Sequence, residues 1–451
     1  MSEFIDASPP PSAHLTTLAQ MGYSFTTAVG DILDNSISAG AKEVRIFFLK
    51  EDGTYRFLLV DDGCGMTRQE LTRNMVVGCH DPNVTRELTD LGRFGSGLKT
   101  ASFSQAEILS VWSWPSVNSI SGAVWDTNHV KKSNAWLLKI LDGNDPLLRD
   151  DVAKYGFSDR GTIVSWGAIS CLETDTVEEA VAAQVAAMIA ELHEYIGLHF
   201  HRFLGQGLRV SINKAAVQPI DPFMTKQLGY LEGPEQVLRS KDGQVRIKAH
   251  TLPRPSTLAE NVLKPYGGSK GITSGQGLYI YRNRRLIVAG GWHGVIGASE
   301  LGNLARIQID IPSTMDWEWD TDVKKSRLRI PPKVRAVLRK VSPAVRKKSR
   351  KIHDYAGSTS AVSNCWKVIE DERNLGSVAY LLNVTAEQLK PVFGELSPGA
   401  KANLKEFLHS ASEELPVQHI YKSFAERPSR TQNTEVVADE IQKLLEALNA
   451  Q

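Results

Sequence analysis

Three short motifs in a fixed order constrain the fold of this chain more than any other feature of its sequence. DILDN occupies residues 31–35, DDGCGM residues 61–66 and LGRFGSGLKT residues 91–100. Taken singly, an Asp-Gly step or a glycine-rich run is more often a plain turn than part of a ligand site. A helix with Asp and Asn, a strand ending in Asp, and a glycine loop that opens a helix are together much rarer by chance.

The first motif lies on a predicted helix. Apolar residues at helical spacing over 24–39, with Ser24 as a cap and a glycine at the end, indicate an amphipathic helix. Asp31 and Asn35 are four residues apart, which places a carboxylate and an amide on one helix face. This arrangement suits a water-orienting base beside a metal ligand. For Asp34, one step round the helix, a solvated polar face is expected.

The second motif follows a predicted hairpin. Residues 42–49 and 55–60 are expected to form two strands joined by a turn, and the second strand delivers Asp61 at its end. An acid beside two glycines, Gly63 and Gly65, can reach the edge of a base.

The third motif predicts an anion cradle. Gly92, Gly95 and Gly97 let the backbone turn tightly, so that its N–H groups approach phosphate oxygens at a helix start. A Walker loop is excluded because Leu98 stands before Lys99, where that motif needs lysine directly after the last glycine.

These motifs resemble those of the GHKL superfamily, which comprises gyrase B subunits, the ninety-kilodalton heat-shock chaperones, histidine kinases and MutL. The stretches DILDNSISAGA, VDDGCGM and LGRFGSGLKTASFS are closest in look to prokaryotic MORC-like ATPases. The resemblance implies an α+β fold: a Bergerat-type two-layer α/β sandwich that binds ATP, then a transducer-like α/β domain and a helical C-terminal region. The implied activity is magnesium-dependent ATP hydrolysis.

The resemblance also implies site residues. Asn35 would bind Mg²⁺, Asp61 would take the adenine amino group, and Thr162 would support that contact through water. Residues 92–100 would hold the phosphates beneath a lid formed by about residues 76–94. The predicted ATP-binding residues are Asn35, Asp61, Gly63, Gly65, Met66, Gly92, Gly95, Ser96, Gly97, Leu98, Lys99, Thr100 and Thr162.

The expected catalytic base departs from the family. Asp31 stands where the family usually has glutamate, and its side chain is one methylene shorter. Two expectations stay open: a slow ATPase, which we favour, or a protein that binds ATP mainly as a switch.

Length and pattern predict more than one domain. A chain of 451 residues exceeds what one core normally supports. We expect an ATP-binding domain over 1–200, a transducer-like domain over 201–335, and a basic helix with a helical domain over 336–451. Helical character is expected for LGSVAYLLN, ANLKEFLHSASEEL and TEVVADEIQKLLEALNA.

The predicted second domain carries a hairpin at Asn283-Arg284 and, later, a loop with two lysines. In the transducers that this domain resembles, a loop lysine reaches the γ-phosphate, where a point charge offsets developing negative charge. Lys325 is the expected catalytic lysine, and Lys324 is the alternative.

Basic residues are concentrated after that loop. From Lys324 to Lys351 there are thirteen Lys or Arg residues and no acidic residue, although the formal net charge of the whole chain is +1. The functional interpretation is a contact surface for the phosphate backbone of DNA. The alternative is a solvated helix face whose charges offset acids elsewhere.

Composition favours a cytoplasmic protein. The four cysteines, at positions 64, 79, 171 and 365, are too scattered for a zinc pair or a disulfide framework. No uncharged apolar run reaches membrane-spanning length, and the acidic, proline-rich N-terminus differs from a signal peptide. No membrane partner is expected.

The resemblance, taken with the basic stretch, implies a homodimer that closes on ATP binding and handles DNA as a clamp. The resemblance to prokaryotic MORC-like proteins also implies a partner from defence or restriction machinery. Two alternatives stay open: a chaperone-type ATPase that acts on proteins, and an ATP-dependent scaffold that does not hydrolyse.

Overall fold

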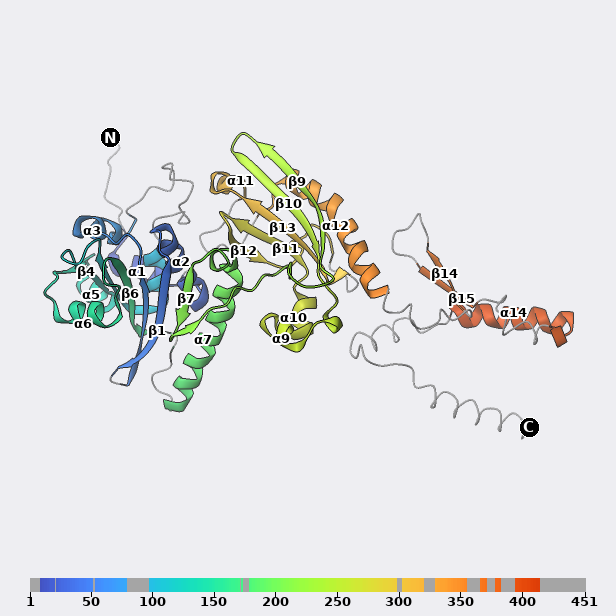
Figure 1. Cartoon of the computed structure of the whole chain (residues 1–451), viewed down its shortest axis with the longest axis horizontal. Coiled ribbons are helices and arrows are strands. Elements are labelled where there is room, and N and C mark those ends of the chain that lie inside the picture. The colour runs from blue at the N-terminus through green and yellow to red at the C-terminus, as the bar shows by residue number, and fades with distance from the viewer. Residues whose placement is uncertain are drawn as a thin grey trace, which may run out of the picture. The chain divides into compact units, whose positions relative to one another are not determined.

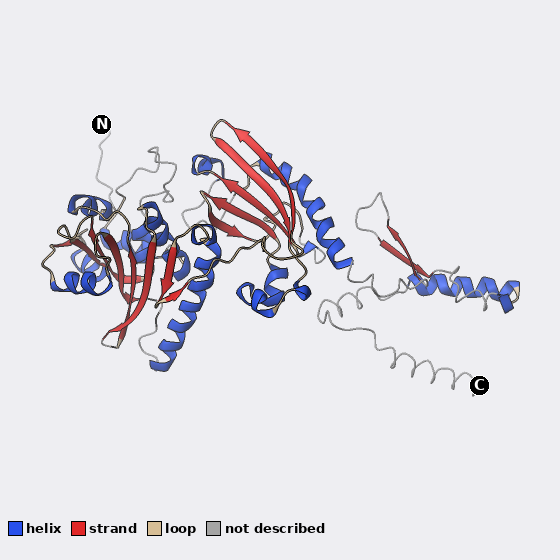
Figure 2. Ribbon diagram, in the orientation of Figure 1, coloured by secondary structure: helices blue, strands red, loops and turns tan. Residues whose placement is uncertain are grey.

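The structure is a computed structural model, and it describes residues 9–20, 22–51, 53–78, 97–170, 172, 178–297, 302–319, 329–354, 366–370, 378–382 and 394–413. The chain divides into two compact units, Met1–Ala356 and Gly357–Gln451. The first unit contains two mixed β-sheets with their helices, and the second contains a two-stranded sheet and a helix (Figures 1 and 2).

The first sheet has eight strands in the order β5-β4-β3-β6-β2-β1-β7-β8. Neighbouring strands are antiparallel except for β1 and β7, which are parallel. The strands are β1 (Glu43–Glu51), β2 (Thr54–Asp61), β3 (Ala106–Trp114), β4 (Ser121–Asp126), β5 (Lys139–Leu141), β6 (Gly161–Ile169), β7 (Arg209–Ile212) and β8 (Ala215–Ala216). The strands predicted at residues 42–49 and 55–60 are therefore confirmed as β1 and β2. Strands β7 and β8 also belong to this sheet, although the boundary expected at 200–201 would place them in the second domain.

Helices accompany this sheet. They are α1 (Pro11–Ala19), α2 (Phe25–Ser38), α3 (Arg68–Met75), α4 (Gly97–Phe103), α5 (Thr127–Ser133), α6 (Pro146–Tyr155), α7 (Glu178–His199) and α8 (His201–Leu204). Helix α2 begins and ends as its sequence predicts. The Ser24 side chain accepts a hydrogen bond from the Thr27 N–H, and Gly40 follows with φ of 76°.

The alternation of side chains along β2 explains why both faces of the sheet are covered. Phe57 and Leu59 belong to the large core that α2 and α7 complete, whereas Leu58 and Val60 pack in a second cluster with Leu148 of α6. The mixed α+β fold predicted from the sequence is confirmed.

The second sheet has five strands in the order β12-β11-β13-β10-β9, with β11 parallel to β13 and the other pairs antiparallel. The strands are β9 (Leu231–Ser240), β10 (Gly243–Thr251), β11 (Gly277–Arg282), β12 (Arg285–Ala289) and β13 (Ala305–Ile311). The short helical turns are η1 (Pro255–Thr257), α9 (Glu260–Leu263), η2 (Lys264–Tyr266), α10 (Gly268–Ser274), η4 (Ser313–Met315) and α11 (Asp316–Trp319).

The predicted hairpin between β11 and β12 is confirmed. Asn283 and Arg284 both adopt left-handed backbone conformations, with φ of 45° and 74°, as a tight two-residue hairpin turn requires. This turn makes Arg285 the first residue of β12 and pairs it with Arg282 of β11.

The long helix α12 (Pro332–Asp354) belongs with the second sheet. Its buried residues Val334, Leu338 and Val345 lie in the same core as the apolar residues of β10 and β13, and the helix runs beside these strands in Figure 1. The domain boundary expected at 335–336 therefore falls inside this helix.

The C-terminal unit corrects one prediction. β14 (Trp366–Glu370) pairs in antiparallel fashion with β15 (Val378–Leu382), so the helix expected for LGSVAYLLN is wrong. Its apolar run is too short to show a helical period, and a cross-strand partner decides its structure. The helix expected for ANLKEFLHSASEEL is confirmed as α14 (Pro398–Glu413), whereas TEVVADEIQKLLEALNA lies outside the described residues.

Across the described residues, no helix is both long enough and apolar enough to span a bilayer.

Candidate functional site

Asp61 forms a buried acceptor at the end of β2. Its carboxylate accepts hydrogen bonds from the Ser36 hydroxyl at 2.7 Å and from the Gly63 N–H at 2.9 Å. Loss of solvent around the side chain raises the pKa of Asp61 to about 6, although both hydrogen bonds favour the ionised form. The ionised carboxylate is suited to accept an amino N–H from the edge of a base.

The two glycines after Asp61 lie where there is no room for a side chain. A Cβ on Gly63 would lie 2.8 Å from Asp61 Oδ1. Gly65 has a φ of 67°, and its Cβ would lie 2.2 Å from the carbonyl oxygen of Trp114. Side chains at either position would displace the loop that surrounds the acid.

Thr162 lies beside Asp61 because β2 and β6 pair with these two residues in register. Its hydroxyl is 2.9 Å from the Ser113 hydroxyl, and Ser113 accepts a hydrogen bond from the Met66 N–H at 2.8 Å. A continuous polar chain therefore joins Met66, Ser113 and Thr162. Ser113 was not predicted, since a serine inside an apolar strand carries no sequence signal of its neighbours.

Asp31 and Asn35 occupy successive turns of α2. The Tyr23 hydroxyl donates to Asp31 Oδ2 at 3.1 Å. A Cβ on Gly97 would lie 3.9 Å from the same oxygen, so the carboxylate faces the first residue of α4. The Asn35 side chain is exposed, as a ligand for a solvated ion requires.

The third motif is only partly described. Gly92, Gly95 and Ser96 lie outside the described residues, as does most of the expected lid. Within α4, Leu98 packs against the core, and Lys99 and Thr100 are buried.

The Lys99 ammonium group donates a hydrogen bond to the Asn74 carbonyl oxygen at 2.6 Å. Asn74 lies in the last turn of α3, so this contact joins the two helices that flank the glycine-rich segment.

A residue that was not predicted approaches Asp31 from the second sheet. Arg285 Nη1 donates to Asp31 Oδ1 at 3.3 Å and also to Asp34 Oδ2, and the guanidinium is buried. The solvated face expected for Asp34 is therefore wrong, because this residue is only 2 % exposed. Lys324 and Lys325 lie outside the described residues.

The strand-end acid Asp61 and the Asp31 carboxylate that faces α4 lie in a region that is similar to GHKL-type ATP-binding domains. Residues 23–156 match the family described as "Histidine kinase-, DNA gyrase B-, and HSP90-like ATPase". The matched segment contains Asp31, Asn35, Asp61 and Gly97, so the superfamily predicted from the motifs is confirmed. No curated protein matches the chain.

Among the residues that the structure describes, no three His, Cys, Asp or Glu side chains are grouped to hold a metal ion. Magnesium sites in nucleotide enzymes commonly use one or two protein oxygens, with phosphates and water completing the shell. A single amide oxygen at Asn35 fits that pattern.

The basic residues of α12 include exposed lysines and also arginines that contact the rest of the fold. Lys333, Lys340 and Lys347 recur every seven residues and are exposed, opposite the buried apolar face. Arg335 and Arg346 instead contact the fold: the first donates to the Gly294 carbonyl at 3.1 Å, and the second lies over the Trp292 ring. The exposed basic surface is therefore narrower than the sequence indicates.

Proposed function

We propose that the protein is a magnesium-dependent ATPase. The observation that carries this proposal is that one domain presents a buried hydrogen-bond acceptor, Asp61, and a carboxylate, Asp31, that faces the helix after the glycine-rich loop. In this proposal Asp61 accepts the adenine amino N–H. Asp31 orients a water molecule and accepts its proton as the water oxygen bonds to the γ-phosphorus. The bond to the β-phosphate oxygen breaks, which leaves ADP and phosphate.

The remaining roles follow from charge and position. Asn35 would hold Mg²⁺, which offsets the negative charge of the phosphates when bound. Lys325 would place a positive charge at the γ-phosphate, with Lys324 as the alternative.

Phosphate release tests this assignment. We expect Asp31→Asn to lower kcat by about 10² to 10⁴-fold, the usual contribution of a general base, with ATP affinity retained. Asp150→Asn is the matched control, since Asp150 is exposed on α6. Wild-type protein that binds ATP and releases no phosphate would support the scaffold instead.

We further propose that ATP binding closes a homodimer that engages DNA. The support is the row Lys333, Lys340 and Lys347, which points away from the second sheet without an acidic residue on the same helix before Asp354. By likeness to MORC-like proteins, the partner would belong to defence or restriction machinery.

DNA binding is measured against salt concentration. Replacing the three lysines with alanine should weaken binding and reduce the slope of log affinity against log salt by about 0.9 for each phosphate that the variant no longer neutralises. Replacing the exposed Lys131, Lys132 and Lys226 is the matched control. ATP-dependent suppression of aggregation, with no salt-sensitive DNA binding, would support the chaperone alternative.

A further inference from the structure

Arg285 connects the second sheet to the catalytic face of α2. It is the first residue of β12 and is separated from Asp31 by 254 positions in the chain. Its Nη1 donates to Asp31 and Asp34, and its Nη2 donates to the Tyr195 hydroxyl at 3.2 Å. The guanidinium therefore joins α2, α7 and β12 at one buried point.

Gly30 provides the space for this contact. A Cβ at this position would lie 2.7 Å from Arg285 Nη2 and 2.9 Å from the Tyr195 hydroxyl oxygen. Glycine inside a helix is unfavourable relative to alanine because of its backbone entropy. The helix thus keeps a locally unfavourable residue directly before Asp31, where the guanidinium and the tyrosine approach its backbone.

The two oxygens of Asp31 have different partners. Oδ1 accepts from Arg285, and Oδ2 accepts from the Tyr23 hydroxyl and faces Gly97. Hydrogen bonds to both oxygens restrict rotation of a carboxylate. The group that would orient water is therefore fixed in part by a residue outside its own domain.

We propose that Arg285 is a positioning residue that makes ATP hydrolysis dependent on the docking of the β11–β12 hairpin against α2. This inference rests on the proposed ATPase function. Closing the hairpin onto α2 sets the Asp31 carboxylate, and withdrawing it releases the carboxylate. The second sheet thereby controls ATP hydrolysis through Arg285, which does not itself contact the nucleotide.

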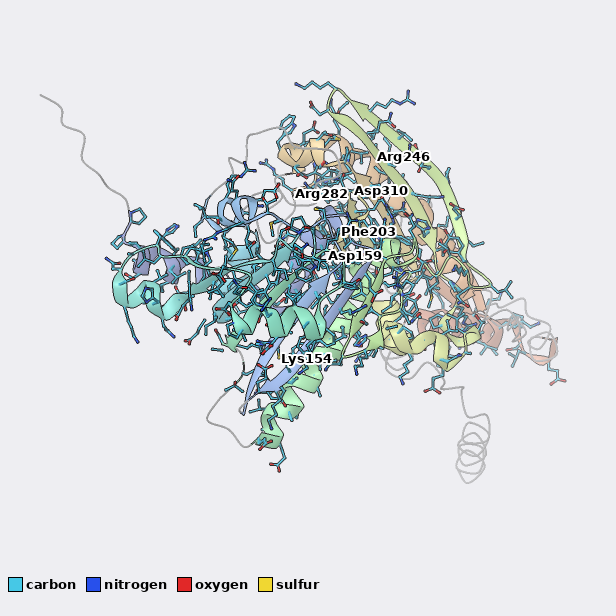
Figure 3. The ribbon with its side chains drawn as sticks, turned by 60° about the vertical axis from the view of Figure 1, so that its left-hand side comes forward. Lys154, Asp159, Phe203, Arg246, Arg282 and Asp310 are labelled. Carbon is cyan, nitrogen blue, oxygen red and sulfur yellow. The ribbon has the colours of Figure 1, made fainter. Side chains whose placement is uncertain are left out.

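A buried ion pair can also be purely structural, and the neighbouring strand β11 has one. Arg282 of β11, labelled in Figure 3, is also buried and forms a bidentate pair with Asp316. It is an arginine of equal size, directly before the turn, and its carboxylate partner belongs to α11, outside the ATP-binding domain. Arg282→Gln is therefore the matched control for the loss of a buried arginine.

The test compares kcat and KM for wild type, Arg285→Gln, Arg285→Lys and Arg282→Gln, with ATP affinity measured separately by calorimetry. We expect Arg285→Gln to lower kcat by about 10 to 100-fold, since misplacement of a catalytic group by about 1 Å can cost that much. ATP affinity should change little. Arg285→Lys should recover part of the rate because it retains a positive charge, and Arg282→Gln should keep the wild-type kcat.

A double-mutant cycle separates positioning from stability. If Arg285 acts through Asp31, then Arg285→Gln should cause no further loss of kcat in an Asp31→Asn background. Gly30→Ala should reproduce the loss with every charge retained, because its methyl group displaces the guanidinium. Gly30→Ala therefore also tests the positioning role if Arg285→Gln does not fold.

The outcomes distinguish the two proposals. Wild-type protein that binds ATP without releasing phosphate overturns the proposed function and the positioning role together. A hydrolysing wild type whose Arg285→Gln and Gly30→Ala variants keep their kcat overturns the positioning role alone. Equal losses of kcat in Arg285→Gln and Arg282→Gln also contradict it, since burial alone would then explain the effect.

Discussion

At the scale of single residues, the site depends on an acid kept in an unfavourable environment. Asp61 is almost fully buried, and desolvation raises its pKa to about 6. The charged form costs free energy before nucleotide binds, and an adenine amino group would restore part of the lost solvation. The ionised carboxylate that favours ATP binding therefore lowers the stability of the nucleotide-free protein.

Acid should weaken ATP binding through Asp61. The protonated carboxyl cannot accept the adenine N–H with that oxygen, so affinity should fall as the pH drops through about 6. Calorimetry from about pH 8 to about pH 5.5 brackets this pKa, and Asp61→Asn corrects for protonation of the triphosphate itself. Identical pH profiles for the two proteins would contradict the assignment.

The same residue predicts a conflict between function and stability. A pKa raised by folding means that the ionised carboxylate destabilises the folded state above a pH of about 6, and that this penalty is lost as pH falls. Asp61→Asn should therefore raise the melting temperature of the nucleotide-free protein at neutral pH while weakening ATP binding, since the amide oxygen is a poorer acceptor than a carboxylate. A lower melting temperature in this variant would contradict the prediction.

Gly65 should not tolerate a side chain. Gly65→Ala combines a left-handed backbone with a clash against the Trp114 carbonyl, and we expect it to cost about 1–3 kcal/mol of stability and to weaken ATP binding. Gly53→Ala is the control, since Gly53 has a similar φ of 79° with nothing within 4 Å of its Cβ. Chemical denaturation measures the stability of both variants. Equal losses of stability would show that the clash with Trp114 does not contribute.

At the scale of elements, the sequence predicts the helices and turns whose structure is determined by residues close by in the chain. The Ser24 cap, the apolar stripe of α2 and the turn at Asn283-Arg284 each lie within a few residues of the structure they determine. Strand β9 was missed because Gly233 and Pro234 weaken its pattern. The burial of Asp34 was missed for a different reason: its partner, Arg285, is 251 positions away.

Helix α12 should stabilise the second sheet through its apolar face. Leu338 is fully buried in that core, so Leu338→Ala should cost about 2–5 kcal/mol. Lys340→Ala, two residues further on the exposed face, should change stability by less than about 0.5 kcal/mol. Urea denaturation compares them, and similar midpoints would contradict the packing.

At the scale of the whole molecule, the two compact units divide after Ala356. The described residues of the candidate ATP site all lie in the first unit, as do both large sheets. The motifs predicted the superfamily because each motif is local, whereas the junction between the two sheets depends on side chains that meet only after folding.

A chain that ends at Ala356 should fold and bind ATP. No described site residue is removed by this truncation, and the core of α12 with the second sheet is retained. Calorimetry should give an ATP affinity within about threefold of the full chain, a difference of roughly 0.6 kcal/mol. An unfolded or non-binding fragment would contradict the division.

The 254 positions between Asp31 and Arg285 also separate the two residues in time during synthesis of the chain. At about 5–20 residues per second, a ribosome needs on the order of 10 to 50 s to synthesise that interval. Throughout it, the nascent chain already contains Asp31, while the arginine that orients this carboxylate has not yet been added. A first domain that folds early would bind ATP without hydrolysing it, and hydrolysis would begin only when the ribosome has delivered the second sheet.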